Sequence, residues 1–111
     1  MPLEETLTLQ QMKAMQERLQ ERYKEKWEPI EPKTARNKML WMQAEIGEAA
    51  QIIKKRGDEA IMQDAQTRED FIEEMCDVLM YWNDILLCYG IPPEQVAAVY
   101  KKKHERNMNR W

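Results

Sequence analysis

The chain has 111 residues and a mass of 13.4 kDa, which is enough for one domain, so we expect a single domain over residues 1–111. Hydrophobic residues make up 43% and charged residues 33%, a balance that excludes a disordered chain and a membrane-embedded one. The longest apolar runs, 78–82 and 85–89, have five residues each. Neither these runs nor the N-terminal residues resemble a membrane span or a signal peptide, which predicts a cytoplasmic protein.

The charge is distributed unevenly along the chain. The net charge of −3 argues against a binder of nucleic-acid polymers. Residues 58–93 carry nine acids and one base, whereas residues 34–57 and 94–111 each carry five bases and two acids. This pattern indicates either complementary solvated surfaces or a cation site with phosphate-binding groups nearby.

The first half of the chain predicts two helices. Thr8 and Gln11 have the spacing of a capping box, and apolar residues follow at intervals of three and four, so we expect a helix over 8–27. The prolines at positions 29 and 32 end it. Thr34 is the expected cap of a second helix that runs to Arg56 and stops at Gly57.

The second half predicts two more helices. Residues 57–66 form a polar loop with room for one helical turn. Thr67, with Asp70 three positions later, opens a third helix that ends at Gly90, and Pro93 suits the first position of a fourth. Four helices joined by short loops predict an all-α, four-helix bundle.

The third helix also bears on assembly. Of the 19 residues from Phe71 to Tyr89, 14 are apolar or aromatic and surround nearly the whole helix. Three amphipathic helices cannot cover such a surface completely, which predicts at least a homodimer, either a dimer or a dimer of dimers. Cys76 and Cys88 are twelve residues apart on this helix, too far for a disulfide, and are expected to be small core residues in a reducing compartment.

Two pairs of acids interrupt the apolar stripes of the second and third helices. Glu45 and Glu48 share a face with Trp41 and Ile52, and Glu74 and Asp77 repeat the i,i+3 spacing on the third helix. Four converging carboxylates repel one another unless protons or a cation neutralise them, and their oxygens suit Mg²⁺ or Mn²⁺. Solvated helix faces are the alternative explanation. Gly47 costs helix stability, which close approach of another helix or a ligand would explain.

A di-iron carboxylate bundle is the obvious rival for such a site. It needs Glu-x-x-His pairs on facing helices. The chain has one histidine, His104, which follows three lysines and is expected to lie on the surface.

The acid pairs and their context resemble a known superfamily. Glu45-x-x-Glu48 and, 25 residues later, Glu74-x-x-Asp77 followed by Val78-Leu79 are similar to the signature of the all-α nucleoside triphosphate pyrophosphohydrolases, the MazG-like and dimeric dUTPase-like superfamily. The segment 41–50 resembles its second-helix motif and the segment 100–110 its final helix. The resemblance covers most of residues 34–111.

The resemblance implies an enzyme that cleaves a nucleoside triphosphate between the α- and β-phosphates, giving the monophosphate and pyrophosphate in nucleotide-pool clean-up. Glu45, Glu48, Glu74 and Asp77 would be the catalytic metal ligands for Mg²⁺, and one of them would orient or deprotonate the attacking water. Such carboxylate-held ions bind phosphate oxygens and polarise phosphorus. The sequence does not distinguish which carboxylate acts on water.

Candidate substrate-binding residues lie outside the acid pairs. Tyr100, Lys103, Asn107 and Arg110 share one face of the fourth helix, where cationic side chains either hold phosphates or simply stabilise the helix end. The candidates for stacking on the base are aromatic residues that are equally suited to a core: Trp27, Trp41, Tyr81 and Trp82. Tyr81, one turn beyond Asp77, is the best placed. The base stays open among uracil, cytosine and modified bases.

Two other functions remain compatible with the sequence. One is a non-catalytic helical module of the same fold that oligomerises or binds a partner. The other is hydrolysis of phosphoribosyl-ATP by a related helical fold. A screen of nucleotide substrates separates these alternatives from the pyrophosphohydrolase.

Overall fold

The computed structural model describes residues 6–111, and every regular element in this range is helical. The predicted all-α class is confirmed, but the described chain contains five α-helices and one short 3-10 helix instead of four helices. These elements are α1 (Leu9–Arg22), η1 (Pro32–Thr34), α2 (Ala35–Arg56), α3 (Asp58–Gln63), α4 (Ala65–Cys88) and α5 (Pro93–Met108). The extra helix, α3, occupies the predicted loop, where Asp58 and Glu59 favour its N-terminus electrostatically.

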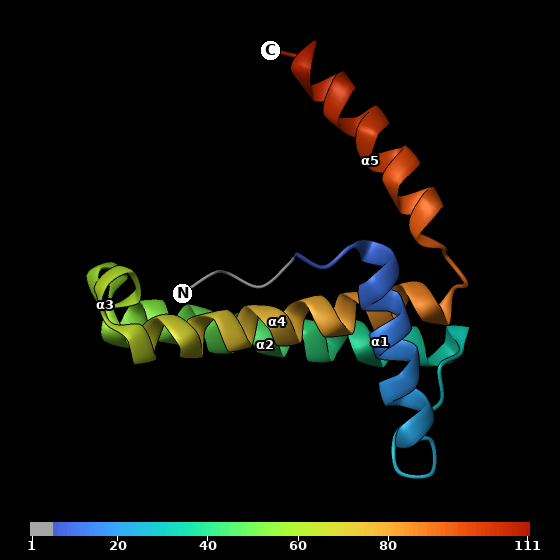
Figure 1. Cartoon of the computed structure of the whole chain (residues 1–111), viewed down its shortest axis with the longest axis horizontal. Coiled ribbons are helices and arrows are strands. Elements are labelled where there is room, and N and C mark those ends of the chain that lie inside the picture. The colour runs from blue at the N-terminus through green and yellow to red at the C-terminus, as the bar shows by residue number, and fades with distance from the viewer. Residues whose placement is uncertain (1–5) are drawn as a thin grey trace.

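Two long antiparallel helices, α2 and α4, form the body of the molecule (Figure 1). The short α3 lies at the turn between them. Near the opposite end α1 crosses the pair, and α5 projects away from it (Figure 1). One chain is therefore a helical hairpin crossed by α1, without the closed four-helix bundle that the sequence predicted.

Local hydrogen bonds explain where α1 begins and ends. The predicted capping box is confirmed: the Thr8 amide donates to Gln11 Oε1 at 2.8 Å, and the Gln11 amide donates to Thr8 Oγ1 at 3.0 Å. The helix ends at Arg22, earlier than predicted, and turns follow. There the Trp27 amide donates to the Tyr23 carbonyl at 2.9 Å and the two rings stack with centroids 4.8 Å apart.

The caps of α2 and α4 differ from the prediction. The Thr34 hydroxyl does not cap α2 and instead donates to the Pro29 carbonyl at 2.7 Å. Helix α4 is capped by Asp64, whose carboxylate accepts from the Thr67 amide at 2.9 Å. The predicted capping box of Thr67 and Asp70 was therefore wrong, and Asp70 instead pairs with Arg56 at 2.8 Å.

The helix boundaries marked by glycine and proline are confirmed. Helix α2 ends at Gly57, which has a φ of 88°, and Gly90, with a φ of 63°, lies in the turn after α4. Both values belong to the left-handed region that glycine adopts without a steric penalty. Pro93 is the first residue of α5, as predicted.

The apolar surface of α4 is only partly covered. The buried apolar residues of the described chain are few, and only one of them is large: Ala35, Ala49, Ile85 and Cys88. Large side chains on α4 stay exposed: Ile72, Met75, Leu79 and Met80. Cys76 is exposed, against the prediction of a core residue, whereas Cys88 is buried, and neither forms a disulfide. Within residues 6–111, none of the helices has both the length and the apolar character needed to cross a membrane.

Candidate metal centre and adjoining pocket

Three of the four predicted acids come together between α2 and α4. One carboxylate oxygen from each of Glu45, Glu74 and Asp77 lies within 4.8 Å of the other two. Glu45 projects from α2, and the other two project from neighbouring turns of α4. The antiparallel hairpin thus joins acids that are about 30 residues apart in sequence, and the donors are the hard oxygens that Mg²⁺ and Mn²⁺ prefer.

The electrostatics of the cluster favour neutralisation of its charge. A hydrogen bond with the Glu45 carboxyl, followed by burial and by the charges of Glu45, Asp77 and Glu48, raises the pKa of Glu74 above its usual range. Glu74 Oε2 is buried and makes no hydrogen bond to any described residue. A proton relieves this repulsion, and a cation that accepts the lone pairs of the unpaired oxygen relieves it as well, so the three residues fit a divalent ion.

The fourth predicted ligand, Glu48, lies outside this cluster. Its side chain is exposed one turn beyond Glu45, near enough to raise the pKa of Glu74 but not among the three converging acids. Neighbouring Gly47 is also exposed, and a Cβ built on it would meet no atom of the described chain within 4 Å. Close approach of another helix of the same chain therefore does not explain this glycine.

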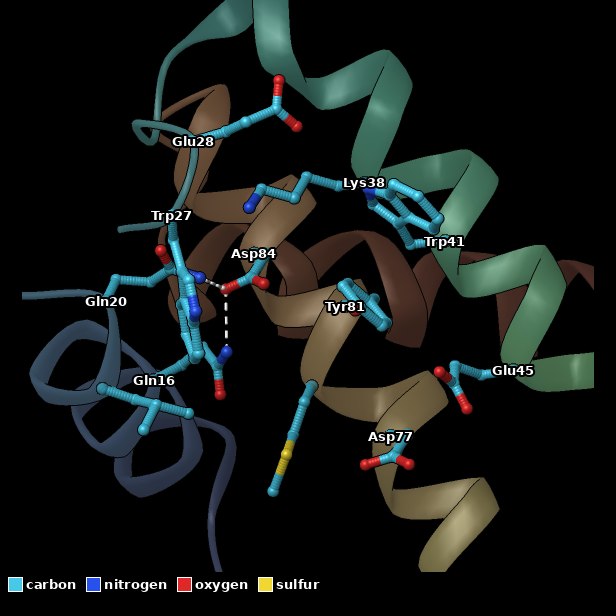
Figure 2. Close-up of a pocket in the computed structure, with 12 residues that line it drawn as sticks. Gln16, Gln20, Trp27, Glu28, Lys38, Trp41, Glu45, Asp77, Tyr81 and Asp84 are labelled. Carbon is cyan, nitrogen blue, oxygen red and sulfur yellow. Dashed lines mark hydrogen bonds between the residues drawn. The ribbon is translucent and has the colours of Figure 1, made fainter. Parts of the chain in front are cut away.

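A pocket of about 430 Å³ adjoins the acids, which is within the range of small-molecule sites. Helices α1, α2 and α4 and the turn after α1 all contribute to its walls. Figure 2 draws its lining: Gln16, Leu19, Gln20, Trp27, Glu28, Lys38, Trp41, Glu45, Asp77, Met80, Tyr81 and Asp84. Of the residues proposed to contact the base, Trp27, Trp41 and Tyr81 lie here, whereas Trp82 lines a separate crevice next to α5.

One end of this pocket is built around a buried acid, Asp84, which is only 2% exposed. Its Oδ1 accepts hydrogen bonds from the side-chain amides of Gln16 at 2.9 Å and Gln20 at 3.1 Å (Figure 2). These hydrogen bonds hold α1 in its position across α4. Burial raises the pKa of Asp84, while the two amides and the positive charge of Lys38 oppose that rise.

Lys38 provides a buried cation at the same end. It is 5% exposed, and its ammonium group points toward Asp84 (Figure 2). Among residues 6–111 its Nζ forms no ion pair and no hydrogen bond. A buried lysine rarely occurs without a partner, so this group is available to a ligand in the pocket.

The residues predicted on the last helix are not part of the pocket. Lys103 and Arg110 are exposed on or just after α5, which points away from the acid cluster (Figure 1). Asn107 is half-buried, and its Oδ1 is buried without a hydrogen-bond partner among the described residues. Tyr100 and Lys103 line a shallow groove with apolar residues of α4. His104 is exposed, as expected. One chain therefore does not bring this basic face to the carboxylates.

Sequence reasoning missed five polar residues of the pocket: Gln16, Gln20, Glu28, Lys38 and Asp84. A signal for two of them was present. Asp84 interrupts the most apolar helix seven residues after Asp77, and Lys38 precedes Glu45 by seven residues. Seven residues are nearly two helical turns, so each lies on the same face as its metal-site neighbour.

Comparisons of the chain with protein-family models, with curated proteins and with solved structures find no match. The site must therefore be interpreted from its own chemistry and from the sequence motifs.

Proposed function

We propose that the protein is a Mg²⁺-dependent nucleoside triphosphate pyrophosphohydrolase, which converts a ribo- or deoxyribonucleoside triphosphate to the monophosphate and pyrophosphate. The observation that carries the proposal is the convergence of Glu45, Glu74 and Asp77 within 4.8 Å beside a pocket lined by aromatic side chains. The similarity of the two acid motifs to MazG-like enzymes supports the choice of reaction, and nucleotide-pool clean-up is the role this chemistry suits.

The residues have separate roles in this proposal. The three converging acids would hold the metal, and Glu48, one turn away on α2, would be the fourth ligand. Bound Mg²⁺ supplies a charge that neutralises phosphate oxygens and makes phosphorus more electrophilic. The carboxylates orient the attacking water and accept its proton. Tyr81 and Trp27, which line the pocket, are placed to contact the nucleoside.

The α5 residues enter the site only if a second copy supplies them. Lys103, Asn107 and Arg110 lie away from the pocket of their own chain, and they would hold phosphates as part of a homodimer or a dimer of dimers. The exposed apolar residues of α4 support association between copies.

A substrate screen with product identification tests the proposed reaction. The protein should release pyrophosphate and a monophosphate from at least one nucleoside triphosphate, and only when Mg²⁺ or Mn²⁺ is present. Release of orthophosphate and a diphosphate would place cleavage at the β–γ bond and contradict the proposal. Turnover of phosphoribosyl-ATP alone would identify the related helical hydrolase.

Metal binding provides a test that does not require the right substrate. Mg²⁺ bound by the folded state should raise the melting temperature of the wild-type protein by mass action. Glu73→Gln is the matched control, because Glu73 is exposed beside Glu74 and lies outside the cluster. It should respond to Mg²⁺ as the wild type does, whereas Asp77→Asn should not. No response in the wild type would favour a non-catalytic helical module.

A further inference from the structure

The end of the pocket farthest from the metal-site acids Glu45 and Asp77 contains polar groups that have no role in the proposed hydrolysis. Asp84 and Lys38 lie at this end, whereas Glu45 and Asp77 lie at the other, with Tyr81 between (Figure 2). The two ends are separated by seven residues on both α2 and α4. At a rise of about 1.5 Å per residue, this is about 10 Å along each helix. The pocket can therefore recognise a ligand at two points.

The buried polar groups at this end present one donor and one acceptor, and the exposed Glu28 carboxylate, whose Oε2 accepts from the Asn37 side-chain amide at 2.8 Å, lines the same end (Figure 2). Lys38 Nζ has only hydrogen atoms to offer and forms no hydrogen bond within residues 6–111. Asp84 uses Oδ1 for both glutamine amides, which leaves Oδ2 without a hydrogen bond from the described chain. The two residues are 95% or more buried, yet neither Lys38 Nζ nor Asp84 Oδ2 is among the fully enclosed unpaired atoms of residues 6–111, so both atoms stay open to a ligand in the pocket.

The remaining walls suit a flat ring. Trp27, Trp41 and Tyr81 line the pocket, and the stacking of Trp27 on Tyr23 holds its indole at the pocket edge. Aromatic walls with a few convergent polar groups are typical of sites that bind planar heterocycles.

We infer that Asp84 and Lys38 recognise the edge of a nucleobase that carries both an exocyclic amino group and a carbonyl oxygen, as cytosine and guanine do. The Asp84 carboxylate accepts from the amino group, and the Lys38 ammonium donates to the carbonyl. Adenine has no carbonyl for the lysine. Uracil and thymine have no amino group. Where cytosine presents its amino group, they present a carbonyl oxygen, which would face the Asp84 carboxylate without a hydrogen between the two acceptors.

This inference rests on the proposed function, because it identifies the base of the proposed nucleotide substrate. Its experiment must therefore not depend on hydrolysis. Binding of dCMP, dGMP, dAMP and dTMP is measured by calorimetry in EDTA, where neither the metal nor turnover contributes. The wild type should bind dCMP or dGMP, or both, at least tenfold more tightly than dAMP and dTMP. The preferred member of the first pair distinguishes cytosine from guanine.

Two substitutions assign the selectivity to these residues. Lys38→Met keeps the aliphatic stem and removes the charge, and it should weaken binding of the preferred monophosphate about tenfold or more, the usual loss for a hydrogen bond to a charged group. Binding of dAMP should change little. Asp84→Asn should also reduce the preference. Lys33→Met is the matched control, since the Lys33 side chain is 83% exposed, and it should bind as the wild type does.

The experiment distinguishes a folding defect, a wrong base assignment and a wrong reaction. Asp84→Asn also alters the hydrogen bonds from Gln16 and Gln20, so the melting temperature of this variant is measured first. Should the Asp84→Asn protein fail to fold, the Lys38→Met result alone decides the inference. Equal binding of all four monophosphates, no binding, or unchanged selectivity in Lys38→Met would overturn the inference. Selective binding without pyrophosphate release from any triphosphate would retain the base pocket and reject the proposed reaction.

Discussion

In the proposed metal site, the three carboxylates that would bind the ion also destabilise the metal-free protein. Glu45, Glu74 and Asp77 repel one another when no cation is bound, and each charge removed lowers that repulsion. A residue selected for a site is expected to cost stability in this way. An acid in a structural ion pair would behave oppositely, because its loss leaves a charge without a partner.

Asp77→Asn tests this opposition between function and stability. Hydrolysis should fall by about 100-fold or more, the usual scale for loss of preorganised electrostatic stabilisation, while the metal-free melting temperature should stay equal or rise. Glu48→Gln should also reduce hydrolysis but leave the metal-free melting temperature nearly unchanged, because Glu48 is exposed. Turnover assays and thermal melts in EDTA measure both quantities. A fully active Asp77→Asn protein would end the metal-site interpretation.

The raised pKa of Glu74 predicts a pH dependence of stability in the metal-free protein. The folded state binds the proton more tightly than the unfolded chain does, so between the ordinary pKa of a glutamate and the raised value the folded state carries more protons. This contribution is fully present below the ordinary pKa and is lost as pH rises through the raised one.

Glu74→Gln should remove that pH dependence. Urea unfolding in EDTA gives the free energy of unfolding at each pH, and the difference between variant and wild type should shift in favour of the variant as pH rises above the ordinary glutamate range. Mg²⁺ affinity of the wild type should fall as pH drops, because the proton competes for the carboxylate. Parallel pH curves for variant and wild type would contradict the assignment.

At the scale of the elements, Asp64 determines where α4 starts. It accepts from the Thr67 amide at 2.9 Å and from the Thr67 hydroxyl at 2.8 Å. These bonds hold the pKa of Asp64 below its ordinary value. The stabilisation is therefore present above the ordinary aspartate pKa and is lost as pH falls through the lowered one.

Asp64→Ala should lower the free energy of unfolding at neutral pH, because α4 loses the side chain that caps its N-terminus. Chemical denaturation measures it, and the effect should disappear in strong acid, where the carboxylate is protonated. Glu69→Ala, an exposed position on the same helix, should show no comparable loss. A neutral-pH effect of Asp64→Ala no larger than that of Glu69→Ala would count against the cap.

The sequence predicts those elements whose signals are local. The Thr8 capping box, the glycine after α2 and the proline at the start of α5 each act within four residues, and all three are confirmed. The predicted cap at Thr67 was wrong because two acids lie three residues from it, Asp64 before and Asp70 after, and only tertiary pairing with Arg56 shows that Asp70 is engaged elsewhere.

The candidate metal centre likewise could be predicted from the sequence only as far as local spacing allows. The i,i+3 spacing identifies the pairs of acids, but whether a given acid faces the opposite helix depends on how α2 and α4 are rotated against each other. This rotation brings Glu45 into the cluster and leaves Glu48 exposed. The buried face of α1 was likewise not predictable from hydropathy, because its buried residues are Gln16 and Gln20, which donate to an acid 64 or more residues away.

At the scale of the whole molecule, a single chain leaves much apolar surface in water. Ile72, Met75 and Leu79, at spacings of three and four on α4, are 50%, 47% and 38% exposed. Residues at these spacings share one face of a helix. An apolar face of this kind on the central helix is typical of an interface between subunits.

We therefore expect a homodimer or a dimer of dimers that covers this face of α4. Light scattering at micromolar concentration should give at least twice the monomer mass of 13.4 kDa. Met75→Glu should shift the protein toward the monomer, because association would bury an unpaired charge. Met62→Glu on α3, where the side chain is 69% exposed and off this face, is the control and should leave the mass unchanged.

If the α5 residues act across the interface, Met75→Glu should lose hydrolysis in proportion to the loss of dimer, and a higher protein concentration should restore both. A folded 13.4 kDa wild type would show instead that α4 carries its apolar face uncovered.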